Sequence, residues 1–133
     1  MQFLTILTPL LAAAVMATAA APVQAQNRGD EALLQMQQAY RKGDRARLTQ
    51  LLPDMRGHVL EPWGAYWELR ARLDQATPQE VAAFLQRFAG TYQEDRLRND
   101  WLLLVGQRRD WAQFSALHPL YRMNDDREVR CYA

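Results

Sequence analysis

The feature that most constrains the fold is the stretch 60–114, where apolar residues recur at helical spacing between residues that start or end helices. All four tryptophans of the chain lie in it. Its strongest signal is residues 77–80, Thr-Pro-Gln-Glu, because Thr followed by Pro, with Glu at the third position, forms a capping box. Apolar residues then fall at i, i+3, i+4 and i+7, namely Val81, Phe84, Leu85 and Phe88. This pattern predicts consecutive amphipathic helices.

Aspartate and glycine mark further helix boundaries on both sides of that helix. Asp30, Asp44 and Asp110 can each cap a helix, since a carboxylate accepts hydrogen bonds from the free amides of a first turn. Gly43 and Gly90 stand where helices commonly end in the left-handed conformation. The chain after its first residues is therefore predicted to be a succession of short helices joined by tight turns.

The predicted helices pair into three hairpins, which cover residues 31–52, 62–89 and 92–118. Asp125 or Asp126 starts a last helix, and the polar residues 26–29 are predicted to be a lead-in without regular structure. Alternation of apolar and polar residues never persists, so no strand is predicted. The sequence therefore predicts an all-α fold of antiparallel helical hairpins stacked as an α-superhelix, or solenoid, over residues 26–133 and broken off in its seventh helix.

The helix that starts near Pro62 has a wide apolar arc, which predicts neighbours on two of its sides. Arg70 lies inside this arc, so its stem can pack on an aromatic ring while its guanidinium meets a carboxylate of an adjacent helix. We predict Glu94, Asp95 or Asp100 as that partner, and we expect the ion pair to be buried.

The first residues predict an export signal. Residues 3–23 are nearly all apolar or small and carry no charge, and a Val-Gln-Ala tripeptide ending at Ala25 suits a signal peptidase. We therefore expect a signal peptide over residues 1–25, cleaved after Ala25, and a periplasmic protein. The alternative is a membrane-spanning helix, for which the run is about long enough, but Pro9 and Pro22 argue against it. No Lys or Arg precedes the run, which departs from the usual signal.

Charge and cysteine content narrow the classes of function. The 16 basic and 15 acidic residues nearly balance, without a basic stripe or an acidic block. This balance favours neither nucleic acid nor an anionic membrane as a partner. Cys131 is the only cysteine, so the chain has no internal disulfide framework and its stability must come from core burial.

Four acidic residues are candidates for a glycosidase-type carboxylate pair: Glu68, Glu80, Asp100 and Asp110. Glu80 and Asp110 have capping roles, and Glu68 falls on the polar side of its helix. Asp100 can pair with Arg96 or with a neighbouring helix. The sequence singles out no pair among the four, so no catalytic residue is assigned and they are interpreted as caps and solvated charges.

No metal ligand and no cofactor site is predicted. His58 and His118 fall in or beside turns without a second ligand at metal-binding spacing, so we expect them to be solvated or bonded to backbone. Cys131 has no histidine placed to activate it and is expected to be a small buried apolar residue. The aromatic residues could form a sugar-stacking surface, but at helical spacing we interpret them as core.

A series of short segments from Leu33 onward has an order and spacing that is more specific than any one of them. They are Ala39 to Asp44, Leu51-Leu52-Pro53, Leu60-Glu61-Pro62-Trp63, Tyr66-Trp67-Glu68-Leu69-Arg70, residues 81–88, Arg96-Leu97-Arg98, Trp101-Leu102, Arg109-Asp110-Trp111 and Arg130-Cys131-Tyr132-Ala133. The series resembles the N-terminal part of the soluble lytic transglycosylases, and it covers nearly all of the chain after the predicted signal.

The resemblance implies a fold and a role. Members of that family begin with a long helical superhelix, often ring- or U-shaped, and have their catalytic Glu in a lysozyme-like domain near the C-terminus. They cut the glycan strand of peptidoglycan between muramic acid and glucosamine without water and leave an anhydromuramoyl end. No residue of this chain matches the catalytic motif. The resemblance therefore implies a non-catalytic scaffold segment in the periplasm, with peptidoglycan as the partner of the whole enzyme.

The alternative hypothesis is a binding module, a complete helical-repeat adaptor that binds other periplasmic cell-wall proteins. The two hypotheses differ in the last helix, because a complete solenoid needs a polar capping helix. Here the helix reaches residue 133 after about two turns, just as Cys131 and Tyr132 enter it. This ending favours the scaffold segment of a longer enzyme.

Overall fold

The computed structural model describes residues 21–133, and every regular element in this part of the chain is a helix. Short 3-10 turns follow α2, α3 and α6. The predicted all-α class is therefore confirmed for residues 21–133. The α-helices are α1 (Ala21–Lys42), α2 (Arg45–Leu51), α3 (Glu61–Ala71), α4 (Pro78–Arg87), α5 (Tyr92–Gln107), α6 (Trp111–Leu117) and α7 (Arg127–Tyr132).

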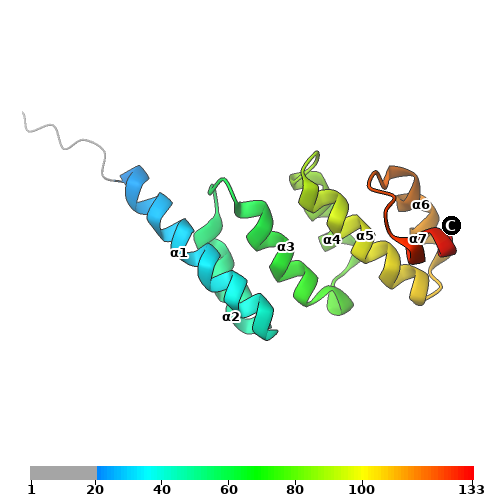
Figure 1. The fold of residues 1–133 in the computed structure, drawn as a ribbon, viewed down its shortest axis with the longest axis horizontal. Helices are drawn as coiled ribbons and strands as arrows, with labels where there is room; N and C mark the ends of the chain where they lie inside the picture. Colours follow the sequence, from blue (N-terminus) through cyan, green and yellow to red (C-terminus); the bar gives the residue numbers. More distant parts are fainter. Residues whose placement is uncertain (1–20) are drawn as a thin grey trace, which may run out of the picture.

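The helices succeed one another in chain order along the long axis of the molecule, with α1 near one end and α7 at the other (Figure 1). The first helix contacts α2 and α3, while α5 contacts α3, α4, α6 and α7. The α5 helix is thus the central element of the second half of the chain. Because it has neighbours on several sides, side chains all round it are buried, including polar ones.

Helix caps form where the sequence predicts them. Thr77 Oγ1 accepts a hydrogen bond from the Glu80 amide, and the Glu80 carboxylate accepts one from the Thr77 amide, so the capping box of α4 is complete. Asp44 and Asp110 cap α2 and α6. Thr91 caps α5, and the sequence analysis did not predict this cap, because it named only Gly90 between the two helices.

The predicted C-terminal ends of α1 and α4 and the predicted start of the last helix are also confirmed. Gly43 and Gly90 follow α1 and α4 with φ of +70° and +84°, a conformation that glycine adopts without the steric cost of a Cβ. Asp126 starts α7, since its carboxylate accepts hydrogen bonds from the amides of Glu128 and Val129. The tight connections between consecutive helices are therefore encoded locally.

The start of the first helix differs from the prediction. Since α1 begins at Ala21, the residues 26–29 predicted as an irregular lead-in are helical, and Asp30 lies inside the helix instead of capping it. From inside the helix Asp30 makes a tertiary contact, since its Oδ1 lies 2.7 Å from Nε2 of His58. The His58 ring packs where Gly29 leaves space, because a Cβ on that glycine would lie 2.6 Å from the ring Cδ2.

The predicted signal peptide covers residues 1–25, and residues 1–20 of it lie outside the described part of the chain. Residues 21–25 form the beginning of α1, and cleavage after Ala25 stays a prediction. A membrane-spanning segment would need a longer or more apolar helix than any that the structure shows in residues 21–133.

Two clusters of buried apolar side chains stabilise the fold. The larger one spans α3 to α7 and includes Leu97, Trp101 and Leu102 of α5. Trp67 packs against both clusters and so links the N-terminal hairpin to the rest. The smaller cluster lies between α1, α2 and the following turn and consists of Ala32, Met36, Ala39, Leu48, Leu51 and Met55.

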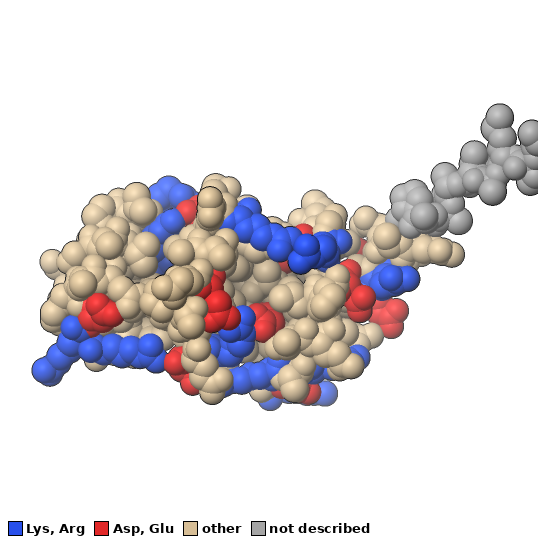
Figure 2. All heavy atoms as spheres, turned by 180° about the vertical axis from the view of Figure 1, so that it is seen from behind, with Lys and Arg blue, Asp and Glu red and all other residues tan. Residues whose placement is uncertain are grey.

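Charged side chains of both signs are scattered over the reverse face of the molecule (Figure 2). Ion pairs among the described residues include Arg72 with Glu80 and Arg87 with Glu61. On this face basic and acidic side chains are thus interspersed, in agreement with the nearly neutral charge of the sequence.

Candidate functional site

The structure brings two of the four candidate acids, Glu68 and Glu80, together on Arg72, whereas Asp100 and Asp110 have other partners. Glu68, predicted to be solvated, is buried. Its Oε1 accepts hydrogen bonds from Arg72 Nε at 2.7 Å and from Thr49 Oγ1 at 3.0 Å. The prediction for Glu68 was wrong because α2 and the Arg72 side chain cover that side of α3, which a helical pattern alone cannot show.

Arg72 also binds Glu80, whose Oε1 lies 2.7 Å from Nη1 of the arginine. The pKa of Glu80 is below its ordinary value because the Thr77 amide, and then Arg72, donate hydrogen bonds to the charged carboxylate. A general acid needs the opposite shift. Asp110 keeps its predicted role as the cap of α6, where it accepts a hydrogen bond from the Gln113 amide at 3.2 Å.

Asp100 binds two side chains of α3. Its Oδ2 accepts a hydrogen bond from Tyr66 Oη at 2.7 Å and lies 3.1 Å from Nε of Arg70. The predicted partner of Arg70 is therefore confirmed, but the expected burial is not, since the Arg70 side chain is 45% exposed and that of Asp100 6%. Burial, and then the neighbouring Asp100 charge, raise the pKa of Tyr66 well above its usual range, so Tyr66 stays a protonated donor.

Asp100 and Arg70 line a groove of about 330 Å³ between α3 and α5, which we call the α3–α5 groove. A second ion pair lies in it, between Arg45 Nη2 and Asp74 Oδ1 at 3.3 Å. Charged residues of both signs beside apolar ones could hold a small polar ligand through hydrogen bonds. The groove is also lined by Leu103, Leu104 and Gln107.

Four aromatic rings form a row that crosses α1, α3 and α5, and we call Tyr40, Trp67, Trp63 and Tyr92 the aromatic row. Consecutive ring centroids are 6.1, 5.8 and 5.8 Å apart. The interpretation of the aromatic residues as core is right for Trp101, which is 2% exposed. It is wrong for Tyr92 and Trp111, which are 55% and 47% exposed.

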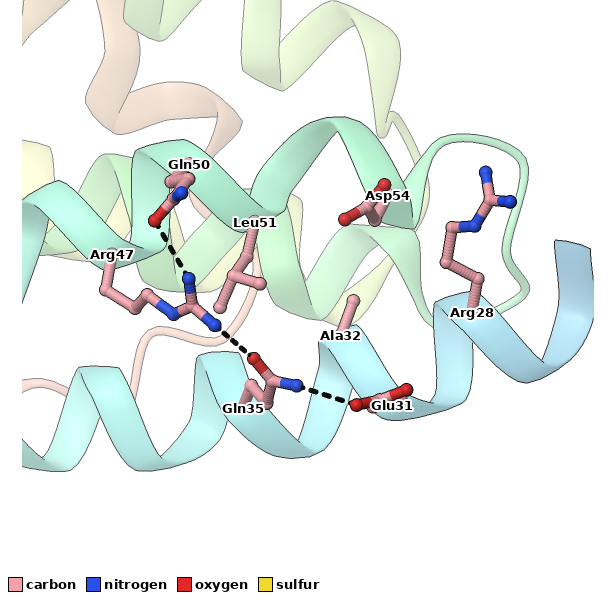
Figure 3. Close-up of a pocket in the computed structure, with 8 residues that line it drawn as sticks. All are labelled: Arg28, Glu31, Ala32, Gln35, Arg47, Gln50, Leu51 and Asp54. Carbon is pink, nitrogen blue, oxygen red and sulfur yellow. Dashed lines mark hydrogen bonds between the residues drawn. The ribbon is translucent and has the colours of Figure 1, made fainter.

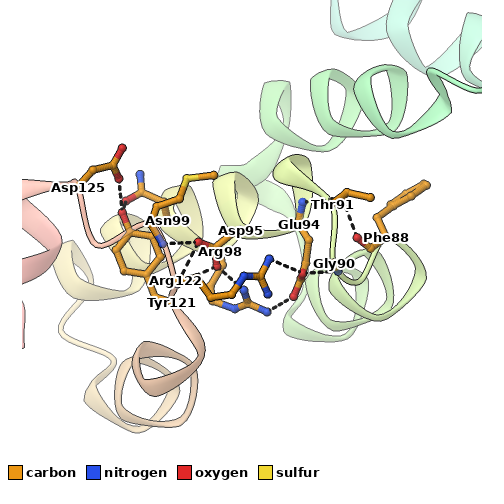
Figure 4. Close-up of polar contacts among 11 residues, drawn as sticks. Phe88, Gly90, Thr91, Glu94, Asp95, Arg98, Asn99, Tyr121, Arg122 and Asp125 are labelled. Carbon is orange, nitrogen blue, oxygen red and sulfur yellow. Dashed lines mark hydrogen bonds and ion pairs between the residues drawn. The ribbon is translucent and has the colours of Figure 1, made fainter.

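A cluster of charged residues is buried in the first half of α5 (Figure 4). Arg98 binds Glu94, and its Nη1 lies 2.6 Å from Oδ1 of Asp95. Asp95 Oδ2 also accepts hydrogen bonds from the backbone amides of Arg122 and Met123, at 3.0 and 2.7 Å. The cluster therefore fixes the segment between α6 and α7 onto α5.

The cluster also sets the charge state of Glu94. Burial acts to raise the pKa of Glu94, but hydrogen bonds from Arg98, from the Gly90 amide and from Arg122 outweigh it and bring the pKa to about 2, from an ordinary 4.5. The side chain is therefore a structural anion that accepts hydrogen bonds. Nε of Arg98 has no hydrogen-bond partner among the described residues.

Tyr121 extends this network toward α7. Its Oη lies 2.9 Å from Oδ1 of Asn99 and 2.7 Å from Oδ1 of Asp125 (Figure 4). Burial, together with the bond to Asp125, raises the pKa of Tyr121 to about 12. Sequence reasoning missed the whole network. The spacing of Glu94 and Arg98 is visible in the sequence, but their burial depends on the segment around Tyr121, whose position only the fold determines.

A second groove runs between α1 and α2 (Figure 3) and has a volume of about 340 Å³. Arg47 donates hydrogen bonds to Gln50, at 2.8 Å, and to Gln35, and Gln35 in turn donates to Glu31 at 3.0 Å. These polar groups bind one another, as the charged groups of the α3–α5 groove also do.

Both histidines contact neighbouring groups of the fold. Of the two surroundings expected for His58, solvent or a backbone bond, the structure shows the second: the ring is buried, and its Nδ1 accepts a hydrogen bond from the Leu60 amide at 3.1 Å. His118 stacks on Phe114 with 5.3 Å between ring centroids. Among residues 21–133, no group of three or more His, Cys, Asp and Glu side chains is placed to hold a metal ion.

Cys131 is exposed, so the expectation of a buried cysteine was wrong. The buried position of the short helix α7 is taken by Val129, two residues earlier, and the thiol consequently faces outward.

Known proteins offer no relative with which this geometry can be compared. No family model, no curated protein and no solved structure matches the chain. The α3–α5 groove and the adjoining aromatic row are therefore described as the candidate site on their geometry alone.

Proposed function

We propose that this chain is a non-catalytic scaffold segment of an exported lytic transglycosylase, an enzyme that cleaves peptidoglycan glycan strands. The observation that supports the proposal is that all four candidate acids are bound within the fold, in ion pairs, hydrogen bonds or helix caps. Their partners are Arg72 and Thr49 for Glu68, Thr77 and Arg72 for Glu80, Arg70 and Tyr66 for Asp100, and the α6 amides for Asp110.

The chemistry of glycosidic cleavage explains why this matters. An acid that protonates the leaving oxygen must be in a groove and must have a raised pKa. Glu80 has a lowered pKa, and so does Glu94 in the buried cluster. Asp100 does face a groove, but it is ion-paired with Arg70 there. The lowered pKa values of Glu80 and Glu94 thus oppose the role of a general acid.

The succession of packed helices supports a scaffold role. The consecutive pairs α1–α2, α2–α3, α4–α5 and α5–α6 pack on each other, α3 and α7 pack on α5, and Trp67 links the two hydrophobic clusters. Stacking of this kind buries one face of each hairpin against the next. We propose that it is the beginning of an α-superhelix, in agreement with the resemblance of the sequence to the transglycosylase N-terminal part.

The proposal includes a location and a partner. The predicted signal over residues 1–25 would export the chain to the periplasm, where the whole enzyme would meet peptidoglycan. Other periplasmic cell-wall proteins are possible partners of the helical array. The nearly neutral charge gives no reason to expect binding to nucleic acid.

The decisive experiment is a product assay. Purified protein is incubated with murein sacculi, and the soluble products are separated by chromatography. We expect no anhydromuropeptides above a control without protein. Release of such products, if abolished by Asp100→Asn or Glu68→Gln, would contradict the scaffold role.

The second half of the proposal is tested at the level of the gene. We expect the DNA beyond codon 133 to continue in frame into a lysozyme-like segment with a catalytic Glu. A stop codon directly after codon 133 would count against a transglycosylase and in favour of an adaptor.

A further inference from the structure

The α3–α5 groove is lined by two pairs of an arginine and an aspartate whose contacts are long. Arg45 Nη2 lies 3.3 Å from Asp74 Oδ1, and Arg70 Nε lies 3.1 Å from Asp100 Oδ2. Charge-assisted hydrogen bonds between such groups are about 2.7–2.9 Å long. The ion pairs of Arg72, at 2.7 Å, have this length. The two pairs of the groove are therefore ion contacts that fall short of full hydrogen bonds.

Both arginines of the groove are accessible from water. The Arg45 side chain is 50% exposed, that of Asp74 54% and that of Arg70 45%. An exposed ion pair contributes little to stability, because water competes for each of its charges. A ligand that offers each charge a better-placed partner can therefore open these pairs at a small cost in free energy.

Asp100 is the most enclosed charge of the groove. Its side chain is 6% exposed, and Tyr66 donates a hydrogen bond of 2.7 Å to its Oδ2. A buried carboxylate is costly without a positive partner, and the guanidinium of Arg70 that accompanies it is on a half-exposed side chain. Asp100 thus offers a preformed negative site for the ammonium group of a ligand.

Apolar side chains form much of the remaining lining. Leu73 is buried, and Leu103 and Leu104 of α5 are partly buried in the same groove. The groove volume of about 330 Å³ lies at the lower end of the range for ligand sites, which is about 300–1,000 Å³. The groove therefore suits a small molecule that has an apolar part.

We propose that the α3–α5 groove binds a small zwitterion, of the class of free aliphatic α-amino acids. The ammonium group binds the Asp100 carboxylate, the ligand carboxylate binds the Arg70 guanidinium, and the aliphatic side chain packs on the leucines. The two charged groups of an α-amino acid are attached to one carbon atom, which suits binding groups as close as Arg70 and Asp100, whose charged atoms are 3.1 Å apart.

The charges of the groove select a zwitterion over a simple ion. An anion attracted by Arg45 and Arg70 also meets the carboxylates of Asp74 and Asp100, and a cation meets the reverse. A ligand with one charge of each sign has a partner for both and is repelled by neither pair. This argument uses the groove alone and does not depend on the transglycosylase role.

The experiment is a titration of the purified protein with L-leucine at pH 7, followed by the leucine methyl signals of the protein in NMR spectra. We expect the signals of Leu73, Leu103 and Leu104 to shift with a common dissociation constant. The signal of Leu48, in the smaller hydrophobic cluster, should stay unchanged. N-acetyl-L-leucine lacks the ammonium group and L-leucinamide lacks the carboxylate, so each should bind about tenfold more weakly than L-leucine.

Two variants assign the charged partners. Arg70→Gln should weaken binding of L-leucine and of N-acetyl-L-leucine about tenfold and leave L-leucinamide unchanged. Asp100→Asn, which keeps an oxygen for the Tyr66 hydroxyl, should weaken L-leucine and L-leucinamide and should not weaken N-acetyl-L-leucine. Arg87→Gln is the matched control, because Arg87 is 48% exposed and paired with Glu61 outside this groove. Circular dichroism verifies that the variants fold.

Three results would overturn the proposal: no shift of the groove signals at millimolar L-leucine, equal affinity for the three ligands, or equal weakening by Arg70→Gln and Arg87→Gln. Tighter binding of N-acetyl-L-leucine than of L-leucine would assign the groove to anions, and tighter binding of L-leucinamide would assign it to cations. The titration uses no sacculi, so its failure leaves the product assay as a separate test of the scaffold role.

Discussion

The interface between α1 and α2 and the interface between α5 and the segment that leads into α7 bury different kinds of side chain. In the first, the buried residues are apolar, with Met36, Leu48 and Met55 fully enclosed. In the second, a buried cluster of Glu94, Asp95 and Arg98 lies beside the apolar core and binds backbone amides of the segment it holds.

The difference shows two ways to attach a helix in the same small array. Apolar contacts are non-directional and depend on volume, so the first interface is specified by shape and size. Charged hydrogen bonds are directional, and a buried charge without its partner is costly. The second interface is therefore specified atom by atom, and it should respond to pH while the first should not.

Arg98→Met should have the largest effect on stability. It leaves the carboxylates of Glu94 and Asp95 buried without their shared arginine, and removal of one member of a buried ion pair costs about 3–5 kcal/mol. Urea denaturation at neutral pH measures this. Arg130→Met is the control, because Arg130 is exposed on α7 and its loss should stay within about 0.5 kcal/mol. Equal effects of the two variants would show that the buried charges are not coupled.

Met36→Ala tests the apolar interface. Met36 is fully buried against α2 and α3, and truncation of such a side chain costs about 2–5 kcal/mol through lost contacts and a cavity. The cost should be the same at pH 7 and pH 4, since no charged group is involved. Leu34→Ala, at an exposed position of the same helix, should be nearly neutral. A cost for Met36→Ala that changes strongly with pH would remove the contrast between the interfaces.

Glu94 should make the second interface sensitive to acid. Because its folded pKa of about 2 lies below the ordinary 4.5, Glu94 contributes stability that is complete above about pH 4.5 and disappears as the pH falls toward 2. The contribution is about 3 kcal/mol at most. Glu94→Gln should therefore be less stable than the natural protein at pH 7, and the difference should shrink between pH 4.5 and 2. Parallel stability curves for the two proteins would exclude this role of Glu94.

Arg70→Ala should have the smallest effect of the four, about 1 kcal/mol. The side chain is 45% exposed, so water can replace it beside Asp100, which also keeps its bond to Tyr66. Thermal unfolding of Arg70→Ala and Arg70→Met separates the ion pair from the apolar stem, because only methionine retains the stem. A loss as large as that of Arg98→Met would mean that the Arg70–Asp100 pair is shielded from water after all.

Local signals in the sequence were sufficient for much of the fold. The caps at Asp44, Thr77 and Asp110 and the glycine ends after α1 and α4 depend on hydrogen bonds and dihedral angles within one turn of a helix. Such features follow from neighbouring residues alone. The candidate site was less accessible, because only the pairing of Arg70 with an acid of α5 was anticipated.

Apart from the helical residues 26–29, the predictions that failed concern how one helix faces another. Asp30 was expected to cap a helix and Glu68 to be solvated, yet Asp30 binds His58 and Glu68 is enclosed by Arg72 and α2. Helical periodicity assigns a residue to a side of its own helix, but the neighbour that covers that side is a property of the assembled chain. The interpretation of Tyr92 as a core residue failed for the same reason.

The sequence by itself thus determined which segments are helical and where nearly all of them start and stop, since capping and periodicity act within a few residues. Only the tertiary structure decided which charged side chains are buried and which aromatic rings remain on the surface. The physical reason is that burial is a relation between segments far apart in the chain. Asp95 is enclosed because residues 121–123 cross α5, and the aromatic row exists because α1, α3 and α5 lie side by side.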